Sequence, residues 1–175
     1  VDASTWYYDA DSDTYGNASV STVSCSAPAG YVADNTDCND GTSAANPGAL
    51  EVCDGIDNDC DGTSDEPDAI DASTWYADAD SDLYGDAATS QPACTQPAGY
   101  VADGTDCDDA RYETNPGATE YCNGYDDDCD GTVDEADAAD SATWYADADS
   151  DLYGDAAVSM VECYQPTGYV SDSTD

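Results

Sequence analysis

The sequence repeats itself with a constant period of 69 residues. Trp6, Trp75 and Trp144 follow this spacing, and four sets of cysteines keep the same step. Repeats of this kind stack or string together, and each unit contacts mainly its neighbours. The predicted units are residues 1–69, residues 70–138 and a partial third unit, residues 139–175.

Each full unit contains an acidic stretch with the spacing of a calcium loop. The copies are DNDCDGTSDEPD, from Asp57, and DDDCDGTVDEAD, from Asp126. Side-chain oxygens fall at positions 1, 3, 5, 9 and 12, glycine at position 6 and a backbone carbonyl at position 7, as in a helix-loop-helix calcium loop. Aspartate replaces the usual glutamate at position 12, and Glu66 at position 10 is a substitute ligand. A solvated acidic turn is the alternative, but two copies with every spacing kept argue against chance. The predicted ligands are Asp57, Asp59, Asp61, Thr63, Asp65 and Asp68, and Asp126, Asp128, Asp130, Thr132, Asp134 and Asp137.

Each unit opens with a second acidic loop, found first in STWYYDADSDTYGN at residues 4–17. Position 6 is Thr14, Leu83 or Leu152 rather than glycine, and position 12 carries no carboxylate. An ion here needs further ligands, which the stretch TDCND at residues 36–40 could supply. A polar turn between two strands, with free acidic loops nearby, is the alternative. The predicted ligands are Asp9, Asp11, Asp13 and Tyr15; Asp78, Asp80, Asp82 and Tyr84; and Asp147, Asp149, Asp151 and Tyr153.

The charge is strongly one-sided. The chain has 41 acidic residues, one basic residue and no histidine, for a formal net charge of −40. Bound divalent cations would neutralise part of it, and salt adaptation is a second interpretation. We expect no nucleic-acid partner and no membrane insertion, because phosphate contacts need Lys and Arg and no segment is apolar enough to span a bilayer. The pattern is cut at both ends, so we expect a window on a longer, processed chain.

Nine cysteines in 175 residues point to disulfides and an oxidising, extracellular compartment. Their spacings are not the CxxC pairs of zinc sites. Four cysteines per unit allow three pairings, and we favour Cys25 with Cys38 and Cys53 with Cys60, repeated one period on. Cys163 is then left over, for a partner beyond the sequence or in another chain. The predicted disulfide cysteines are Cys25, Cys38, Cys53, Cys60, Cys94, Cys107, Cys122 and Cys129.

Short strands are favoured between the acidic loops. Residues 5–7, 19–25 and 31–32 are predicted strands, with a Pro-Gly turn before the last. Asn46 and Pro47 predict one short helix turn over residues 49–53. We therefore expect a mostly β and irregular fold: an elongated array of small disulfide-pinned repeats, each with short strands, one helix turn and DxDxDG calcium loops.

The run from Cys25 to Glu66 resembles the MopE-type repeat, a family called "putative metal-binding motif" that recurs in long secreted and surface proteins of bacteria and archaea. The resemblance rests on CSAPAGYVADNTDCND and NPGALEVCDGIDNDCDGTSDE and on their copies in the second unit. The loop is also similar to dockerin and thrombospondin type 3 calcium loops. This resemblance implies calcium and an extracellular setting. The copper-binding founder of the family uses histidine ligands, whereas this chain has no histidine and only Met160 as a soft thioether.

Three classes of function compete. The constant period and the cysteines favour a structural calcium-binding repeat of an extracellular fibre, stalk or adhesin that assembles head-to-tail with further copies of the repeat. The alternative is a binding module for carbohydrate or another ligand that uses exposed Trp and Tyr side chains, and exposure of Trp6, Trp75 and Trp144 would support it. We expect no catalysis, since the carboxylates stand at ligand spacing and no Ser-His or Cys-His pair exists. Asn17 lies in the only N-glycosylation sequon, and surface glycans are a further expectation.

Overall fold

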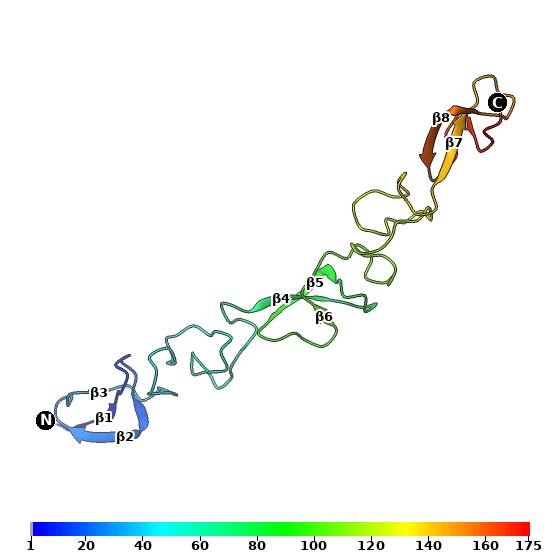
Figure 1. Ribbon diagram of the computed structural model, residues 1–175. Coiled ribbons are helices and arrows are strands. Elements are labelled where there is room, and N and C mark those ends of the chain that lie inside the picture. Colours follow the sequence, from blue (N-terminus) through cyan, green and yellow to red (C-terminus); the bar gives the residue numbers. More distant parts are fainter. Residues whose placement is uncertain (1) are drawn as a thin grey trace. The chain divides into compact units, whose positions relative to one another are not determined.

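The structure is a computed structural model, and it describes residues 2–175. Each repeat begins with a small three-stranded antiparallel sheet, in which the first strand of the repeat lies between the other two (Figure 1). The prediction of a mostly β and irregular fold is confirmed. The strands are β1 (Ser4–Tyr8), β2 (Asn17–Ser24), β3 (Tyr31–Val32), β4 (Ser73–Ala77), β5 (Asp86–Ala93), β6 (Tyr100–Val101), β7 (Ala142–Ala146), β8 (Asp155–Glu162) and β9 (Tyr169–Val170).

The register of the first sheet shows how its acidic loop is placed. β1 pairs with β2 from Ser4↔Ser24 to Tyr7↔Ser21, and a bulge then sets Tyr8 opposite Asn17. The loop between these strands therefore lies at the end of the sheet where β1 also meets β3. β7 repeats both pairings with β8 and β9.

These sheets bury very little apolar surface. Among residues 2–175, the buried apolar side chains are those of Ala45, Ala69 and Ala138. The side chains of Trp6 and Trp144 are half-buried, and their indole N–H groups donate to the carbonyls of Ser24 and Glu162. A core of this size needs covalent or ionic reinforcement to hold one structure.

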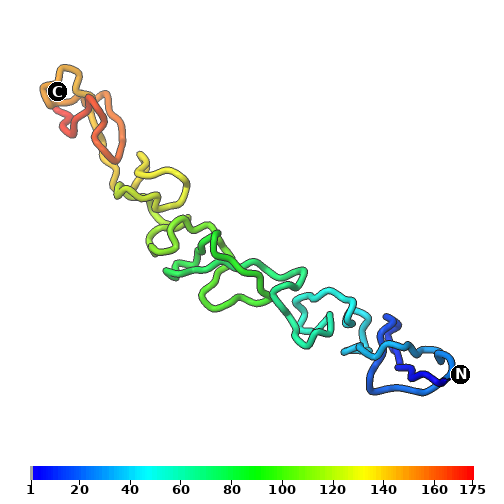
Figure 2. The backbone as a smooth tube through the Cα atoms, turned by 180° about the vertical axis from the view of Figure 1, so that it is seen from behind, coloured from blue at the N-terminus to red at the C-terminus, as the bar shows by residue number. Residues whose placement is uncertain are grey.

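The stretch between β3 and β4 is a run of turns and bends, drawn mainly in cyan in Figure 2. The helix turn predicted at residues 49–53 is wrong, and no helix occurs in residues 2–175. The backbone turn bonds here run from Ala49 N to Asn46 O and from Asp54 N to Val52 O, both at 2.9 Å, and neither has the spacing of an α-helix. The N–H groups of Val52 and Cys53 donate instead to the side chains of Asn58 and Asp71, so no helical bond is available to them.

Four disulfides bond eight of the nine cysteines, but the pairing predicted from the sequence is wrong. Cys38 bonds Cys60 across 22 residues, and Cys53 bonds Cys94 across 41 residues, in the sequence of the next repeat. The second repeat has the same two bonds, so Cys163 is not left over. The corrected pairs are Cys38–Cys60, Cys53–Cys94, Cys107–Cys129 and Cys122–Cys163.

Cys25 is an exposed free thiol in this structure, contrary to its predicted bond with Cys38. β2 separates the two residues. Cys25 follows the last residue of β2, whereas Asp37, next to Cys38, bridges to Asn17 at the first. An eight-residue strand spans roughly 25 Å, and a disulfide needs Cα atoms within about 7 Å.

By their contacts, the residues group into two compact units, Val1–Thr74 with Gln91–Gln96 and Trp75–Ser90 with Pro97–Asp175. The Cys53–Cys94 bond lies within the first unit and the Cys122–Cys163 bond within the second. A search of residues 2–175 finds no helix with the length and apolar character needed to cross a membrane.

Candidate metal centres

We use the name glycine loop for residues 57–66 and 126–135. The first aspartate of this loop folds the backbone around itself: Asp57 Oδ1 accepts from Asp61 N at 3.1 Å, and Asp57 Oδ2 accepts from Gly62 N at 3.1 Å. Asp61 Oδ1 then accepts from Thr63 N at 2.9 Å. Gly62 has a φ of 105°, which only glycine adopts without strain. The second copy repeats each bond, so both loops have a shape set by their own aspartates.

Glu51 supports the glycine loop from outside it. This residue is 5% exposed, and its Oε2 accepts from Asn58 N at 2.8 Å while its Oε1 accepts from Asp65 N at 3.0 Å. Glu120 does the same in the second repeat. Both oxygens of each glutamate accept backbone N–H groups, as a cap does, and an oxygen of Glu51 also lies within 4.8 Å of oxygens of Asp57 and Asp59.

The carboxylate of Glu66 is buried without a partner. Both of its oxygens have less than 1 Å² of accessible area and receive no hydrogen bond, and both oxygens of Glu135 are in the same situation. The Thr63 hydroxyl lowers the pKa of Glu66, but burial and the carboxylates of Glu51 and Asp61 outweigh it and raise that pKa. An anionic group left in this way strongly favours a bound cation.

The last two predicted ligands of the glycine loop have different surroundings. Asp65 Oδ1 accepts from Gly55 N at 2.9 Å, so one oxygen of this residue holds the preceding turn. Asp68, at position 12, is exposed. The structure therefore favours Glu66, at position 10, as the residue that closes the loop, and the same holds for Glu135 over the exposed Asp137.

We use the name aspartate loop for residues 9–15, 78–84 and 147–153. In the first copy, Asp9 Oδ1 accepts from Ser12 N at 2.7 Å and Asp13 Oδ1 accepts from Tyr15 N at 2.8 Å. Position 6 adopts a positive φ although it is not glycine: 85° at Thr14 and 83° at Leu83. The loop therefore takes the left-handed turn that its sequence does not favour.

The late glycine of each aspartate loop allows a close approach rather than a turn. A Cβ atom on Gly16 would lie 2.8 Å from Asp34 O and 2.9 Å from Val32 Cγ2. The chain after β3 can therefore pass directly beside the loop. Gly85 and Gly154 are equally crowded in the other repeats.

This approach brings the TDCND stretch into the aspartate loop. Asp37 bridges to Asn17, and Asp40 Oδ1 accepts from Ala10 N at 2.7 Å. Carboxylate oxygens of Asp11, Asp37 and Asp40 lie within 4.8 Å of one another. Asp9, Asp11 and Asp13 form a second such group that shares Asp11.

The crowding shows in the ionisation of these carboxyl groups. Burial, and then the carboxylates of Asp13, Asp9 and Asp40, raise the pKa of Asp11 above its ordinary value of 3.8. Burial is likewise the main cause that raises the pKa of Asp37. The equivalent residues Asp80 and Asp106 behave in the same way. The carboxylates of the aspartate loops thus repel one another when no cation lies between them.

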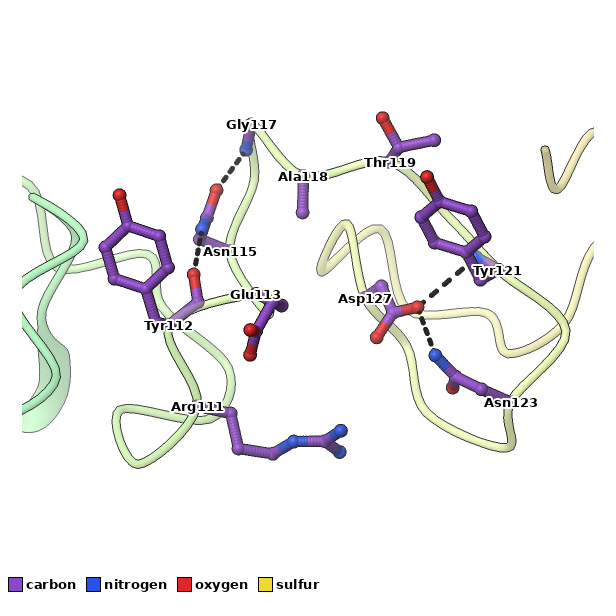
Figure 3. A pocket seen from close by; sticks show the side chains of 10 residues that line it. All are labelled: Arg111, Tyr112, Glu113, Asn115, Gly117, Ala118, Thr119, Tyr121, Asn123 and Asp127. Carbon is purple, nitrogen blue, oxygen red and sulfur yellow. Dashed lines mark hydrogen bonds between the residues drawn. The ribbon is translucent and has the colours of Figure 1, made fainter.

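The one basic side chain of the protein lies in a hollow of the second repeat, with a volume of about 510 Å³ (Figure 3). The Arg111 guanidinium stacks 3.4 Å from the ring centre of Tyr125, and Asp127 at the opposite side accepts from Asn123 Nδ2 at 2.6 Å. Thr42 and Ser43 stand one period before Arg111 and Tyr112. The hollow therefore has no side-chain counterpart in the first repeat, unlike the acidic loops.

Comparison with known families agrees with the resemblance seen in the sequence. The family model described as "Putative metal-binding motif", of the copper-binding MopE type, matches residues 37–66 and 106–135. The chain thus carries two copies of this motif, each running from the aspartate of the TDC stretch through the glycine loop. No curated protein and no solved structure matches the chain.

The donor atoms do not suit copper. Histidine is absent from the sequence, and the cysteines beside Asp37 and Asp106 are bonded in disulfides, so they offer no thiolate. What remains around both kinds of loop is carboxylate oxygen, the ligand type of calcium and other hard cations.

Proposed function

We propose that this chain is a calcium-binding structural repeat of an extracellular fibre, stalk or adhesin, stiffened by ions and disulfides and joined head-to-tail to further repeats. The observation that carries the proposal is the buried, unpartnered carboxylate of Glu66 and Glu135 in the two glycine loops. The carboxylates of Glu51 and Asp61 lie near Glu66, and oxygens of Glu51, Asp57 and Asp59 lie within 4.8 Å of one another. Calcium accepts six to eight such oxygens, and it would replace repulsion among the carboxylates by attraction.

The covalent pattern supports the structural side of the proposal. The Cys53–Cys94 and Cys122–Cys163 disulfides each connect the segment before a glycine loop to the strand-forming segment of the next repeat. The four disulfides fit an oxidising environment. The buried core is too small to organise the repeat alone. We assign no catalytic role to the carboxylates.

The competing ligand-binding module has weaker support. Trp6 and Trp144 are half-buried and their indole N–H groups donate to strand carbonyls, so they offer less surface for stacking than the exposed Tyr112. Thr42 stands at the place of Arg111 in the first repeat, so the Arg111 hollow does not account for a property shared by the repeats. Asn17 remains a predicted glycosylation site; its Oδ1 accepts from Ser19 N at 2.9 Å.

The test is equilibrium dialysis of the disulfide-intact chain against calcium, with bound metal counted by elemental analysis. Glu66→Gln combined with Glu135→Gln should release calcium from both glycine loops, whereas Glu113→Gln, an exposed glutamate, should not. Dialysis against copper should leave less bound metal than dialysis against calcium. Retention of all calcium by the double variant would contradict the assignment. Electron micrographs should show fibres only when calcium is present.

A further inference from the structure

Two carboxylates of the aspartate loop and one of the TDCND stretch use their two oxygens in different ways. Oδ1 of Asp11, Asp13 and Asp37 accepts a backbone N–H two residues further on, from Asp13, Tyr15 and Asn39. Oδ2 of each of these residues has less than 1 Å² of accessible area and no hydrogen-bond partner. One oxygen therefore holds the backbone, while the other is buried among carboxylates.

The second repeat shows the same arrangement at every position. Asp80, Asp82 and Asp106 each have a buried, unpartnered Oδ2, and Asp109 Oδ1 accepts from Ala79 N at 2.7 Å as Asp40 does from Ala10 N. No basic side chain is available to pair with them: the one arginine of the protein stacks on Tyr125. Buried anionic oxygens that converge without a partner indicate a missing cation.

We propose that the aspartate loop and the TDCxD stretch downstream form one composite calcium site, built from two segments of each repeat. In the first repeat its ligands are the carboxylates of Asp9, Asp11, Asp13, Asp37 and Asp40; in the second they are those of Asp78, Asp80, Asp82, Asp106 and Asp109. The proposal rests on the proposed calcium function and adds a second, distinct site to it.

The composite site would connect the parts of a repeat that the glycine loop does not reach. Asp37 and Asp40 flank Cys38, whose disulfide to Cys60 leads into the glycine loop. An ion held by both segments would therefore fasten the end of the β1–β2 hairpin to the disulfide-bonded loop. The family motif begins at Asp37 and does not include the aspartate loop, so the motif contains only half of this site.

The third aspartate loop provides an internal comparison. It has Asp147, Asp149 and Asp151, and Asp175 stands at the place of Asp37, with its N–H bonded to Gly154 O at 3.2 Å. Asp149 and Asp151 are exposed, unlike their half-buried counterparts Asp11 and Asp13.

The test uses Asp37→Asn with Asp40→Asn in the disulfide-intact chain. Asparagine keeps the Oδ1 acceptor that holds the backbone and removes the anionic oxygen. The double variant should bind one calcium ion fewer than the unaltered chain. Its melting temperature should fall in calcium but rise in calcium-free buffer, because the repulsion is relieved. Asp34→Asn, an exposed aspartate of the same segment, is the matched control and should bind the full number of ions.

The outcomes separate this inference from the proposed function. If the double variant binds as many calcium ions as the unaltered chain, the composite site is overturned, while the glycine loops are unaffected. If the double variant melts lower in both buffers, its aspartates are structural and not ligands, which also overturns the site. Suppose that the Glu66→Gln, Glu135→Gln double variant retains all its calcium while the Asp37→Asn, Asp40→Asn double variant loses one ion. The composite site then stands and the glycine-loop assignment fails.

Discussion

The two kinds of acidic loop have a similar shape, but the glycine loop forms mainly from its own residues, whereas the aspartate loop depends on a distant segment. The glycine loop contains its own turn residue, Gly62, and its own closing carboxylate, Glu66, within ten residues. The aspartate loop has Thr14 at the turn position and draws Asp37 and Asp40 from a segment more than twenty residues away. A motif search recognises the first loop in one stretch, whereas the second becomes a site only in the folded repeat.

Loss of the disulfide that connects the two loops should have the largest effect among the predicted substitutions. Cys38→Ser with Cys60→Ser should lower the free energy of unfolding by about 3 kcal/mol, because the unfolded chain regains the entropy of a 22-residue loop. Chemical denaturation in calcium measures this loss. Cys25→Ser is the control, since Cys25 is exposed and unbonded here, and it should leave stability unchanged. An equal loss in both variants would contradict the observed pairing.

Loss of the Glu51 cap, which only the glycine loop has, should have the second largest effect on stability. Glu51→Gln replaces one buried acceptor by an amide NH₂ that faces backbone N–H groups, and it should cost about 2 kcal/mol. The loss should be present in calcium-free buffer as well as in calcium. Denaturation of Glu113→Gln, an exposed glutamate, provides the baseline. A loss confined to calcium would make Glu51 a ligand rather than a cap.

Substitutions at the turn position, position 6, should change stability in opposite directions in the two kinds of loop. Leu83 is 73% exposed and has a φ of 83°, so Leu83→Gly should remove backbone strain and stabilise the chain by about 0.5 kcal/mol after the entropy of glycine is subtracted. Gly62→Ala should destabilise by about 1 kcal/mol for the opposite reason. Melting curves of both variants measure the difference. Leu50→Gly, at an exposed leucine without a positive φ, should only destabilise, and stabilisation there would remove the strain argument.

A change of pH should have the smallest effect, and it originates in the carboxyl groups whose pKa the fold raises, which include Glu66 and Glu135 of the glycine loops. The raised pKa values of Asp11, Asp37, Asp80 and Asp106 mean that the folded, calcium-free chain binds more protons than the unfolded chain just above pH 3.8. Stability should then decrease as the pH rises through those raised values. Melting temperatures in calcium-free buffer between about pH 4 and 7 measure this slope.

Calcium should reverse the sign of this pH dependence, because protons compete with the ion for the same oxygens. The lowered pKa values of Asp61 and Asp130, caused first by the hydroxyls of Thr63 and Thr132, oppose this slope only below about pH 5. A melting temperature that rises with pH in calcium-free buffer would contradict the repulsion inferred for the aspartate loops.

The comparison also shows which features the sequence could predict. The repeat, the strands around Trp6 and the oxygen pattern from Asp57 are local patterns of the sequence, and the structure has the strands where they were expected. The predicted Cys25–Cys38 bond failed because these two cysteines lie at opposite ends of β2, and Cys53 and Cys60 bond instead to Cys94 and Cys38. The helix turn failed because Asn58 and Asp71 capture the N–H groups of Val52 and Cys53. Both errors arise from partners that only the fold brings together.

The caps were harder to find for the same reason. Glu51 recurs as Glu120 in the NPGAxE stretch, and this recurrence was the available signal for a structural role. Its partners at Asn58 and Asp65 are set by the loop geometry rather than by a motif. Thr14 and Leu83 at the turn position argued against a left-handed turn, yet the turn forms, with three of the loop carboxylates bonded to its backbone.

Thermal unfolding of the disulfide-intact chain, in calcium and in EGTA, tests the central claim most directly. Each site filled at a hundredfold excess over its dissociation constant adds about 2.7 kcal/mol, so several sites should raise the melting temperature by about ten degrees or more. Sodium chloride at matched ionic strength controls for screening of the −40 charge. A large rise with calcium alone is the predicted result. Equal melting temperatures in calcium and EGTA, with no calcium retained, would contradict the account and make the acidic loops solvated turns.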